Sequence, residues 1–400
     1  MKNSKTVLLI SISEIYHNPR LIKAADEFHK KGYHVIVNDI ILGNVPEETY
    51  LKFISSKPWT VNSIDISKRS FRSKLNFYFC SIINVASKLM WRNFRFNFLF
   101  EFYLAKGLIL FTKKYKPSII YTNVIDALPF CIKLRNQSKA KFIFDSQELF
   151  SGQYQHSERH LKDWILFAEQ ANLPKADIIL ATTGIMGRRI KELYPNARTP
   201  IRVRNLPNER ENIELKKVQN PIQLIWHGYA IYLNSRGIKL LLDGIRLCDA
   251  PVILTLQGNV SEEEKSTIKS YLGTAHLHKI DFKPQAPVGK IVNSILGYDV
   301  GVIGEQAENE NQLYTSSNKL FDYLHAGLPV VTTEMPGIIE TINEGVGLSY
   351  KNAEEFKTLI EKIAQDDNFY TELRKNAFLF AKNNIWGKDF DHVISKIELL

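Results

Sequence analysis

Short runs rich in β-branched and aromatic residues alternate with segments of helical periodicity along most of the chain. This alternation constrains the fold strongly, because strands that alternate with helices form parallel sheets covered by helices on both faces. In the first half, strands are predicted at 6–12, 33–39, 58–66, 117–123, 140–145 and 177–182, and helices at 19–31, 127–137, 159–173 and 184–194. In the second half, strands are predicted at 222–227, 252–257, 280–282, 299–303 and 328–332. We therefore expect an α/β protein built from doubly wound parallel sheets.

The length of the chain predicts two domains. Four hundred residues exceed what one hydrophobic core usually holds. Between the two halves, Asn205-Leu206-Pro207-Asn208 precedes a charged, weakly periodic stretch at 209–220 that is typical of a linker. The predicted domains are 1–206 and 207–380, followed by a terminal segment at 381–400 with a helix at 392–400. Ligands of such sheets bind in a cleft at the carboxyl ends of the strands.

Charge and cysteine content narrow the classes of partner and compartment. The formal charge of +10 at pH 7 favours an anionic partner. Charge alone does not distinguish among phosphate, nucleic acid and a membrane surface. Cys80, Cys131 and Cys248 are far apart, which favours a reducing cytoplasm over a disulfide framework. The sequence shows no spacing typical of a metal site, so His227 is expected to be a surface or structural residue.

The region 69–116 interleaves Lys and Arg with Phe, Tyr and Trp. Such helices fit an interfacial surface that meets anionic lipid headgroups, so we expect peripheral contact with the inner face of the cell membrane. The alternative is that the aromatic side chains form the core of the domain and the cations its solvated face. The longest uncharged run, 75–87, is too short to cross a bilayer as a helix. No RNA-binding motif is present, so nucleic acid is not an expected partner.

Residues 315–331 predict a short helix aimed at an anion. Ser316 or Ser317 can cap its start by accepting a backbone N–H bond, and the glycine and proline of Gly327-Leu328-Pro329 end it. The open N-terminus and its dipole favour a phosphate, and Asp322, one turn in, can accept hydrogen bonds from sugar hydroxyls. This combination suits a nucleotide-sugar. Taken alone, the pattern fits equally well an ordinary amphipathic helix before a buried strand.

A second feature is the loop from Gly228 to Arg236. A predicted strand ends at Gly228, and Arg236-Gly237 opens a predicted helix at 238–248. An arginine at this place can hold a diphosphate bidentately and offset the charge that grows on a departing nucleoside diphosphate. Arg236 is therefore the first candidate for a catalytic residue. The alternative is a solvated arginine in the first turn of a helix, where a cation gains nothing from the dipole.

These segments resemble a known family of enzymes, the retaining glycosyltransferases of family 4, which have the GT-B fold. The donor half of that family is similar to this chain at Gly228, at Arg236-Gly237, at Asn318-Lys319-Leu320-Phe321-Asp322-Tyr323 and at Ala326-Gly327-Leu328-Pro329-Val330-Val331. Its acceptor half is similar at Asn18-Pro19-Arg20, at Gly32-Tyr33-His34-Val35 and at Asp145-Ser146-Gln147-Glu148-Leu149. The resemblance covers nearly the whole chain. It implies two Rossmann-like domains that face a cleft, with acceptor binding in the first domain, donor binding in the second and a last helix that crosses back to the first.

The resemblance also implies an activity. A sugar of the hexosyl type is transferred from a nucleoside-diphosphate sugar to a glycan or lipid-linked acceptor, with retention of anomeric configuration and without a metal or cofactor. Bacterial-type surface polysaccharide biosynthesis is the implied setting. The implied donor-binding residues are Gly228, Arg236, Thr315, Ser316, Ser317, Asn318, Lys319 and Asp322, of which Asp322 binds the ribose and Lys319 either helps or is merely exposed. The candidate catalytic residues are Arg236, Gln147 and Glu148, and Asp126 is a further candidate on the acceptor side.

The chain departs from the family's pattern at three positions. Tyr314 falls where the family carries an acidic residue that commonly binds the transferred sugar. Tyr229 stands where an arginine is frequent, and Gln147 where a histidine is frequent. A glutamine cannot act as a base, but none is obligatory if the leaving phosphate accepts the proton of the acceptor, as in the front-face mechanism favoured for this family.

These departures leave other interpretations open. Three acids in the preceding loop could substitute for the acidic residue that Tyr314 replaces: Glu305, Glu308 and Glu310. The chain could also be a nucleotide-sugar epimerase of the same fold, or a non-catalytic subunit that binds a glycan or a partner enzyme. Analysis of the product formed from donor alone, and direct measurement of nucleotide binding, distinguish these interpretations.

Overall fold

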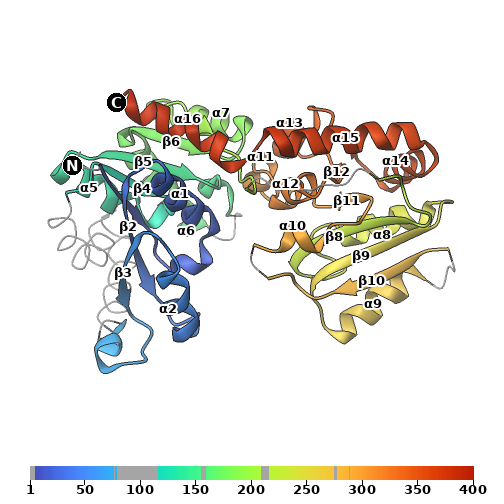
Figure 1. The fold of residues 1–400 in the computed structure, drawn as a ribbon, viewed down its shortest axis with the longest axis horizontal. Coiled ribbons are helices and arrows are strands. Elements are labelled where there is room, and N and C mark those ends of the chain that lie inside the picture. The colour runs from blue at the N-terminus through green and yellow to red at the C-terminus, as the bar shows by residue number, and fades with distance from the viewer. Residues whose placement is uncertain are drawn as a thin grey trace. The chain divides into compact units, whose positions relative to one another are not determined.

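The computed structural model describes residues 5–75, 77–78, 116–154, 159–208, 216–273, 277–287 and 289–400. The chain divides into two compact units, one formed by 1–203 with 390–400 and the other by 204–389 (Figure 1). The boundaries predicted from the sequence lie after residues 206 and 380. Each unit contains one parallel β-sheet flanked by helices.

The first unit is built on a seven-stranded sheet in the order β3-β2-β1-β4-β5-β6-β7, and every neighbouring pair is parallel. Its strands are β1 (Thr6–Ile10), β2 (His34–Ile41), β3 (Thr60–Asp65), β4 (Ile119–Thr122), β5 (Lys141–Ser146), β6 (Ile178–Ala181) and β7 (Ile201–Arg202). The order reverses between β1 and β4, which pair directly. Ligands of doubly wound sheets bind at such a switch point, beyond the carboxyl ends of the strands.

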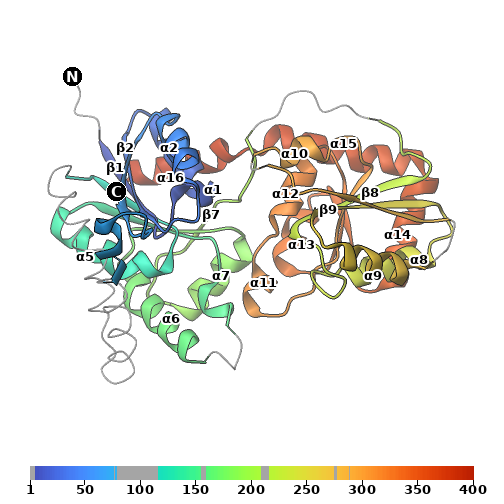
Figure 2. The same cartoon turned by 90° about the horizontal axis from the view of Figure 1, so that it is seen from below.

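Helices cover both faces of the first sheet. They are α1 (Pro19–Lys30), α2 (Glu47–Ser55), α5 (Leu128–Ser138), α6 (Arg159–Asn172), α7 (Gly184–Leu193) and the later part of α16 (Trp386–Glu398). Because parallel crossovers are right-handed, α1 and α2 lie on one face and α5 and α6 on the other (Figure 2). The helix α16 joins α1, since the ring of Phe390 packs edge-on against Phe28 at a centroid distance of 5.1 Å.

The second unit is built on a six-stranded parallel sheet in the order β10-β9-β8-β11-β12-β13. Its strands are β8 (Ile222–Ala230), β9 (Val252–Asn259), β10 (Lys279–Lys283), β11 (Val300–Ile303), β12 (Val330–Thr333) and β13 (Gly347–Tyr350). Its helices are α8 (Ile238–Leu247), α9 (Glu262–Leu272), α10 (Ile291–Ser294), α11 (Glu310–Tyr314), α12 (Asn318–His325), α13 (Pro336–Ile342), α14 (Ala353–Gln365) and α15 (Asp367–Asn383). One face carries α8, α9 and α14 over a continuous apolar core, and α12 packs with α15 on the other (Figure 2).

The two doubly wound parallel sheets confirm the predicted fold class. Every strand predicted from the sequence is present, with ends that differ by a few residues. The sequence did not reveal β7, which has two residues, or β13, whose Gly-Leu-Ser-Tyr lacks an apolar run. The last helix begins at Trp386, six residues before the predicted start, because Trp386 and Phe390 are both buried and extend the apolar face of the helix.

A buried ion pair joins the two ends of the second unit. The guanidinium of Arg204 donates to both carboxylate oxygens of Asp389 at 2.9 and 2.8 Å, and also to Asn384 Oδ1 at 2.8 Å. The backbone N–H of Arg204 donates to the same Asp389 carboxylate. Bidentate pairs of this kind fix geometry as well as charge. The chain therefore enters and leaves this unit at one clamped point.

No helix among the described residues is long and apolar enough to cross a membrane. The predicted membrane-contacting region, 69–116, lies largely outside the described residues, which omit 76 and 79–115. Of its described part, Arg69 donates to the backbone carbonyls of Gly43 and Val45, and Phe71 is exposed.

A buried carboxyl group supports the segment that follows β5 in the first unit. Glu169 of α6 accepts a hydrogen bond from the hydroxyl of Tyr194 at 2.5 Å, and the same hydroxyl lies 3.4 Å from Ser151 Oγ. Burial raises the pKa of Glu169 from its ordinary value of 4.5 to about 7, against opposing hydrogen bonds from Tyr194 and Ser151. The three side chains join α6, the end of α7 and the turn at Phe150–Gly152.

Two glycines bring the start of α8 against the end of β11 in the second unit. A Cβ on Gly237 would lie 1.6 Å from the carbonyl oxygen of Gly304, and one on Gly304 would lie 2.4 Å from the carbonyl oxygen of Gly237. Gly237 also has a φ of +72°, a left-handed conformation that side chains disfavour. Only glycine at both positions permits this approach, which brings Arg236 beside Glu305.

We expect Gly237→Ala to destabilise the second unit by clearly more than the ~1–2 kcal/mol of left-handed strain alone. The added methyl group overlaps the Gly304 backbone, whereas a Cβ on Gly297, at φ +89°, meets nothing within 4 Å. Gly297→Ala is therefore the matched control for strain without overlap. Urea unfolding followed by circular dichroism measures both variants, and equal losses would contradict the proposed backbone contact.

We expect the stability of the first unit to fall as the pH rises from about 4.5 to above 7. The folded carboxyl of Glu169 keeps a proton that the unfolded chain releases, so its contribution is complete below pH 4.5 and is lost above the folded pKa of about 7. The difference corresponds to roughly 3 kcal/mol. Urea unfolding across this range should show the loss in the wild-type protein and a flatter profile in Glu169→Gln. Parallel profiles would show that Glu169 does not titrate as described, and Glu192→Gln, at an exposed ion pair, serves as the control.

Candidate functional site

The carboxyl end of β8 is shaped by a β-bulge. His227 pairs with Gln257 and Ala230 with Asn259, so Gly228 and Tyr229 together oppose the single residue Gly258. Gly228 is required here, because a Cβ on it would lie 2.4 Å from the ring of Trp226. The bulge leaves the Tyr229 side chain 71% exposed. It also bends the strand end, a common use of bulges beside functional sites.

A cavity of about 250 Å³ lies beside this bulge, within the second unit. Its lining comes from the ends of β8 and β9, the residue Arg236 just before α8, the loop after β10, the start of α10 and the first turns of α12. The lining residues are His227, Gly228, Tyr229, Arg236, Gln257, Gln285, Ala286, Ile291, Ser317, Asn318, Lys319 and Asp322. The structure therefore brings together Gly228, Arg236, Ser317, Asn318, Lys319 and Asp322 of the predicted donor-binding set.

Two members of the predicted set, Thr315 and Ser316, do not line the cavity. The Thr315 hydroxyl donates to the carbonyl of Asn311 at 2.8 Å. The Ser316 hydroxyl is buried and has no hydrogen-bond partner within the described part of the chain.

The helix α12 begins and ends close to the predicted positions. Ser317 occupies the N-cap position, but among the described residues no side chain makes the capping hydrogen bond, so the predicted capping by Ser316 or Ser317 is wrong. Gly327, at φ +70°, and the bond from the Leu328 N–H to the Tyr323 carbonyl end the helix as predicted. The first-turn N–H groups, uncapped by a side chain, lie at the cavity, where they favour an anion.

Lys319 is buried, in contrast to the exposed position that helix lysines usually take. The residue is 4% exposed, and its Nζ lies 2.6 Å from Glu305 Oε1 and 5.2 Å from the centroid of the Trp226 ring. Burial lowers the pKa of Lys319, and the carboxylate of Glu305 opposes that effect. Glu305 is thus the charge partner of a buried ammonium group.

Arg236 reaches the same carboxylate from the other side. Its Nη1 lies 3.6 Å from Glu305 Oε1, and its side chain is 54% exposed. The backbone of Arg236 has a φ of +50°, which is uncommon for a residue with a side chain and costs about 1 kcal/mol or more. Strain of this kind occurs often at functional sites, where it fixes the direction of a side chain.

His227 and Asp322 form the inner part of the cavity. His227 is buried, contrary to a surface location, and its Nε2 lies 3.5 Å from Asp322 Oδ2. Burial, together with the charge of Lys319, lowers the pKa of His227 to about 3. The imidazole is therefore neutral at neutral pH. The Tyr323 ring packs edge-on against it at 5.1 Å, and the His227 backbone N–H donates to the Tyr323 hydroxyl.

The other acids considered as substitutes at the Tyr314 position lie away from the cavity lining. Glu308 is exposed and Glu310 begins α11, whereas Tyr314 ends that helix. The backbone of Tyr314 and Thr315 packs against Gly337, where a Cβ would lie 2.6 and 2.3 Å from their carbonyl oxygens. Glu305 is therefore the acid of this loop nearest to the cavity.

The first unit holds the predicted acceptor-side residues. Gln147 and Glu148 follow β5, where the Ser146 hydroxyl donates to the Glu148 carbonyl at 2.8 Å and the Thr182 hydroxyl to the Gln147 carbonyl at 3.5 Å. Asp126 follows β4, the strand between β5 and the switch point, and burial raises its pKa to about 6. These bonds fix the backbone of the segment that follows β5.

A buried ion pair that sequence analysis did not foresee joins two of the segments that resemble the family. Arg20 donates to both carboxylate oxygens of Asp145 at 2.6 and 2.8 Å and to the Val203 carbonyl. The Tyr121 hydroxyl donates to the same carboxylate at 2.5 Å. Arg20 ends the Asn-Pro-Arg likeness and Asp145 begins the Asp-Ser-Gln-Glu-Leu likeness. Each segment thus holds the other in place.

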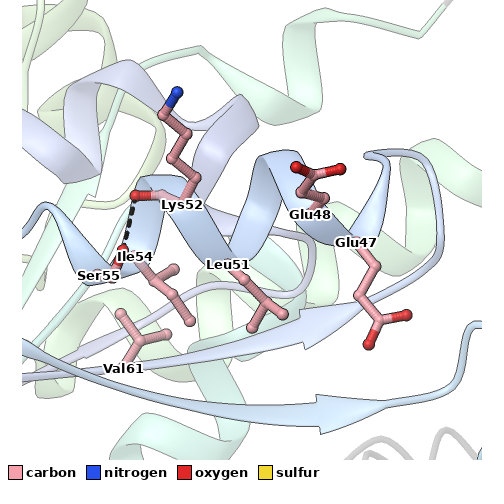
Figure 3. A pocket seen from close by; sticks show the side chains of 7 residues that line it. All are labelled: Glu47, Glu48, Leu51, Lys52, Ile54, Ser55 and Val61. Carbon is pink, nitrogen blue, oxygen red and sulfur yellow. Dashed lines mark hydrogen bonds between the residues drawn. The ribbon is translucent and has the colours of Figure 1, made fainter.

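A second hollow lies in the first unit between α2 and β3 (Figure 3). Leu51, Ile54 and Val61 line its apolar part, whereas the side chains of Glu48 and Lys52 point away from the strand. It is open and lacks converging polar groups of the kind that orient a sugar or a phosphate. Among the described residues no group of three or more His, Cys, Asp or Glu is arranged to hold a metal ion. The cavity in the second unit is therefore the candidate ligand site.

Comparison with known proteins shows the fold. No family model matches the chain, and no curated protein is similar to it in sequence. Among solved structures, Anabaena HepE in complex with UDP-glucose is 12% identical with a TM-score of 0.67, over 99% of this chain and 100% of that one. Sucrose-phosphate synthase from Thermosynechococcus elongatus is 15% identical with a TM-score of 0.66, over 98% of each chain.

A trehalose-6-phosphate synthase, studied for glycosyl transfer with retention, is 12% identical with a TM-score of 0.66 over 99% of each chain. Identities this low establish shared architecture and leave activity to be argued from the site. The two parallel-sheet units and these full-length likenesses show that the chain has the GT-B fold.

Proposed function

We propose that this protein is a retaining glycosyltransferase whose nucleoside-diphosphate-sugar donor binds in the cavity of the second unit. The observation that carries the proposal is the convergence of Arg236, the start of α12 and Asp322 on one cavity, from segments 80 or more residues apart in the sequence. These are a cation, a helix N-terminus and a carboxylate, which match a diphosphate and a ribose. Anabaena HepE, which has the same fold, was solved with UDP-glucose.

The diphosphate would lie between the start of α12 and Arg236. The first-turn N–H groups of α12 and its dipole supply partial positive charge, and Ser317 leaves them uncapped. Arg236 is half exposed, so its guanidinium can turn toward a phosphate oxygen at little desolvation cost. We propose that Gly228, Ser317 and Asn318, which line the same cavity, lie beside the diphosphate.

The ribose would be bound by Asp322. A carboxylate accepts two hydrogen bonds from vicinal hydroxyl groups, and Asp322 is one turn into α12, about 6 Å along the axis from the phosphate position. The neutral imidazole of His227 beside it does not cancel its charge. The side chain of Asp322 is shorter than the Glu that is common in the family. We propose that the nucleoside must therefore enter the cavity more deeply to reach it.

In the transfer step the bond from the sugar's anomeric carbon to the diphosphate breaks, and a bond to the acceptor oxygen forms on the same face. The acceptor's proton passes to the leaving phosphate oxygen, so no side-chain base is needed. Negative charge grows on the departing diphosphate, where Arg236 and the α12 dipole stabilise it. We propose that these positive charges stabilise the leaving group without a metal ion.

The acceptor side is proposed for the first unit. Gln147 and Glu148 follow a central strand of a doubly wound sheet at the edge where such sheets bind ligands. We propose a glycan or lipid-linked acceptor, in surface polysaccharide synthesis at the inner face of a membrane. This part of the proposal rests on the family resemblance and on the basic, aromatic composition of 69–116.

A non-catalytic glycan-binding or partner-binding role is the second candidate. It is favoured by Tyr229, which is 71% exposed at the bulge where an arginine is frequent in the family. In that case the protein would bind no nucleoside diphosphate in calorimetry. An epimerase would convert the donor sugar in the absence of any acceptor.

We expect Arg236→Ala to lower turnover about 10²- to 10³-fold, as loss of one preorganised charged donor does in other enzymes. The fold should persist, because the side chain is half exposed. Transfer from a panel of UDP-, GDP- and other nucleoside-diphosphate sugars, followed by release of the nucleoside diphosphate, measures the effect.

Arg246→Ala is the matched control for this experiment. Arg246 lies near the end of α8, the helix that begins two residues after Arg236. It is exposed, and its guanidinium lies over the Tyr271 ring at 5.6 Å rather than at the cavity. Near-normal turnover by Arg236→Ala, or an equal loss in Arg246→Ala, would refute the role of Arg236.

A further inference from the structure

The carboxylate of Glu305 is paired with both cations of the candidate site. One of its oxygens, Oε1, lies 2.6 Å from Lys319 Nζ and 3.6 Å from Arg236 Nη1. Both cations line the cavity, whereas Glu305 is not among its lining residues. The two positive side chains best placed for a diphosphate therefore already share an internal anion.

The backbone of Glu305 is held tightly. It follows Gly304, which is locked against Gly237, and its carbonyl accepts a hydrogen bond from the Thr333 hydroxyl. The carboxylate is held in turn by its short, mostly buried pair with Lys319. Any change of partners must come from the cations.

The two ion pairs differ in strength. The pair with Lys319 is short, and both side chains are mostly buried, at 6% and 17% exposure. Breaking it would leave a buried ammonium without an anion, which is strongly unfavourable. The pair with Arg236 is longer, and the guanidinium is half exposed, so solvent screens it and its loss costs little. Arg236 is the partner that can be exchanged.

We propose that Glu305 is a built-in competitor for the donor's diphosphate: it keeps Lys319 throughout, holds Arg236 in the empty site, and releases Arg236 when a phosphate enters. This inference rests on the proposed function of the cavity. It makes Glu305 a residue that sets nucleotide affinity, instead of a ligand of the transferred sugar.

The mechanism has a physical consequence for product release. A diphosphate that leaves the site is replaced on Arg236 by a tethered anion at high effective concentration. Without that anion, Arg236 would hold the product more tightly. The loss of Glu305's charge should therefore tighten binding of the nucleoside diphosphate, an effect opposite in sign to the removal of a ligand-binding residue.

Isothermal titration of UDP, GDP and the corresponding nucleotide-sugars into the wild-type protein, Glu305→Gln and Glu308→Gln at low ionic strength tests the proposal. We expect Glu305→Gln to bind the nucleotide roughly threefold to tenfold more tightly than wild type. The gain should shrink at higher salt, because screening weakens the half-exposed pair. Glu308 is an exposed acid of the same loop whose backbone N–H, not its carboxylate, bonds Gln312, so its variant controls for net charge.

A double-mutant cycle identifies the route of the effect. In the Arg236→Ala background, Glu305→Gln should change affinity much less than in the wild-type background, because the competition acts through Arg236. Glu305→Asp, which retains a carboxylate for Lys319 but withdraws it by one methylene, should give a smaller gain and serves if Glu305→Gln does not fold.

The outcomes separate this inference from the proposed function. If the wild-type protein binds none of the nucleoside diphosphates, the proposed function fails. If it binds one and Glu305→Gln binds equally or more weakly, the competitor role alone is overturned. If Glu305→Gln weakens binding of the nucleotide-sugar and leaves that of the nucleoside diphosphate unchanged, Glu305 contacts the sugar and the inference is wrong.

Discussion

The close backbone contact between Gly237 and Gly304 is the constraint on which the candidate site depends. It brings the first turn of α8 against the end of β11, two elements connected by more than fifty residues of chain. The contact places Arg236 in a strained left-handed conformation beside the carboxylate of Glu305. With a larger residue at either glycine, the cation and the acid would separate. The charges at the cavity thus follow from a steric requirement of the backbone.

Charge balance explains how the cavity can be both stable when empty and attractive to an anion. The cations Arg236 and Lys319 are offset by Glu305 and Asp322, and His227 is neutral. The positive potential that attracts an anionic ligand therefore has two sources. One is the uncapped start of α12, and the other is the charge of Arg236 once Arg236 is no longer paired with Glu305. Buried Lys319 holds the carboxylate of Glu305 in place. The proposed exchange at this site involves only the ion pair between Arg236 and Glu305.

Sequence patterns predicted the parts of the structure that depend on local chemistry. The strand and helix alternation predicted both sheets. Arg236 and Asp322, which residue type and spacing singled out, both line the cavity of the second unit. Long-range packing decided the rest. Lys319 is buried because Trp226 and Glu305 surround it, and the bulge at Gly228 arises from pairing with β9. No periodicity in the sequence encodes such contacts.

The central claim is that a nucleoside diphosphate binds within the second unit, between Arg236 and the start of α12, with its ribose on Asp322. A crystal structure of the protein with bound UDP or GDP tests this most directly. The account predicts phosphate oxygens within hydrogen-bond distance of the first-turn N–H groups of α12 and of the Arg236 guanidinium, and ribose hydroxyls on Asp322. A diphosphate bound elsewhere, with Arg236 still paired to Glu305, would contradict it.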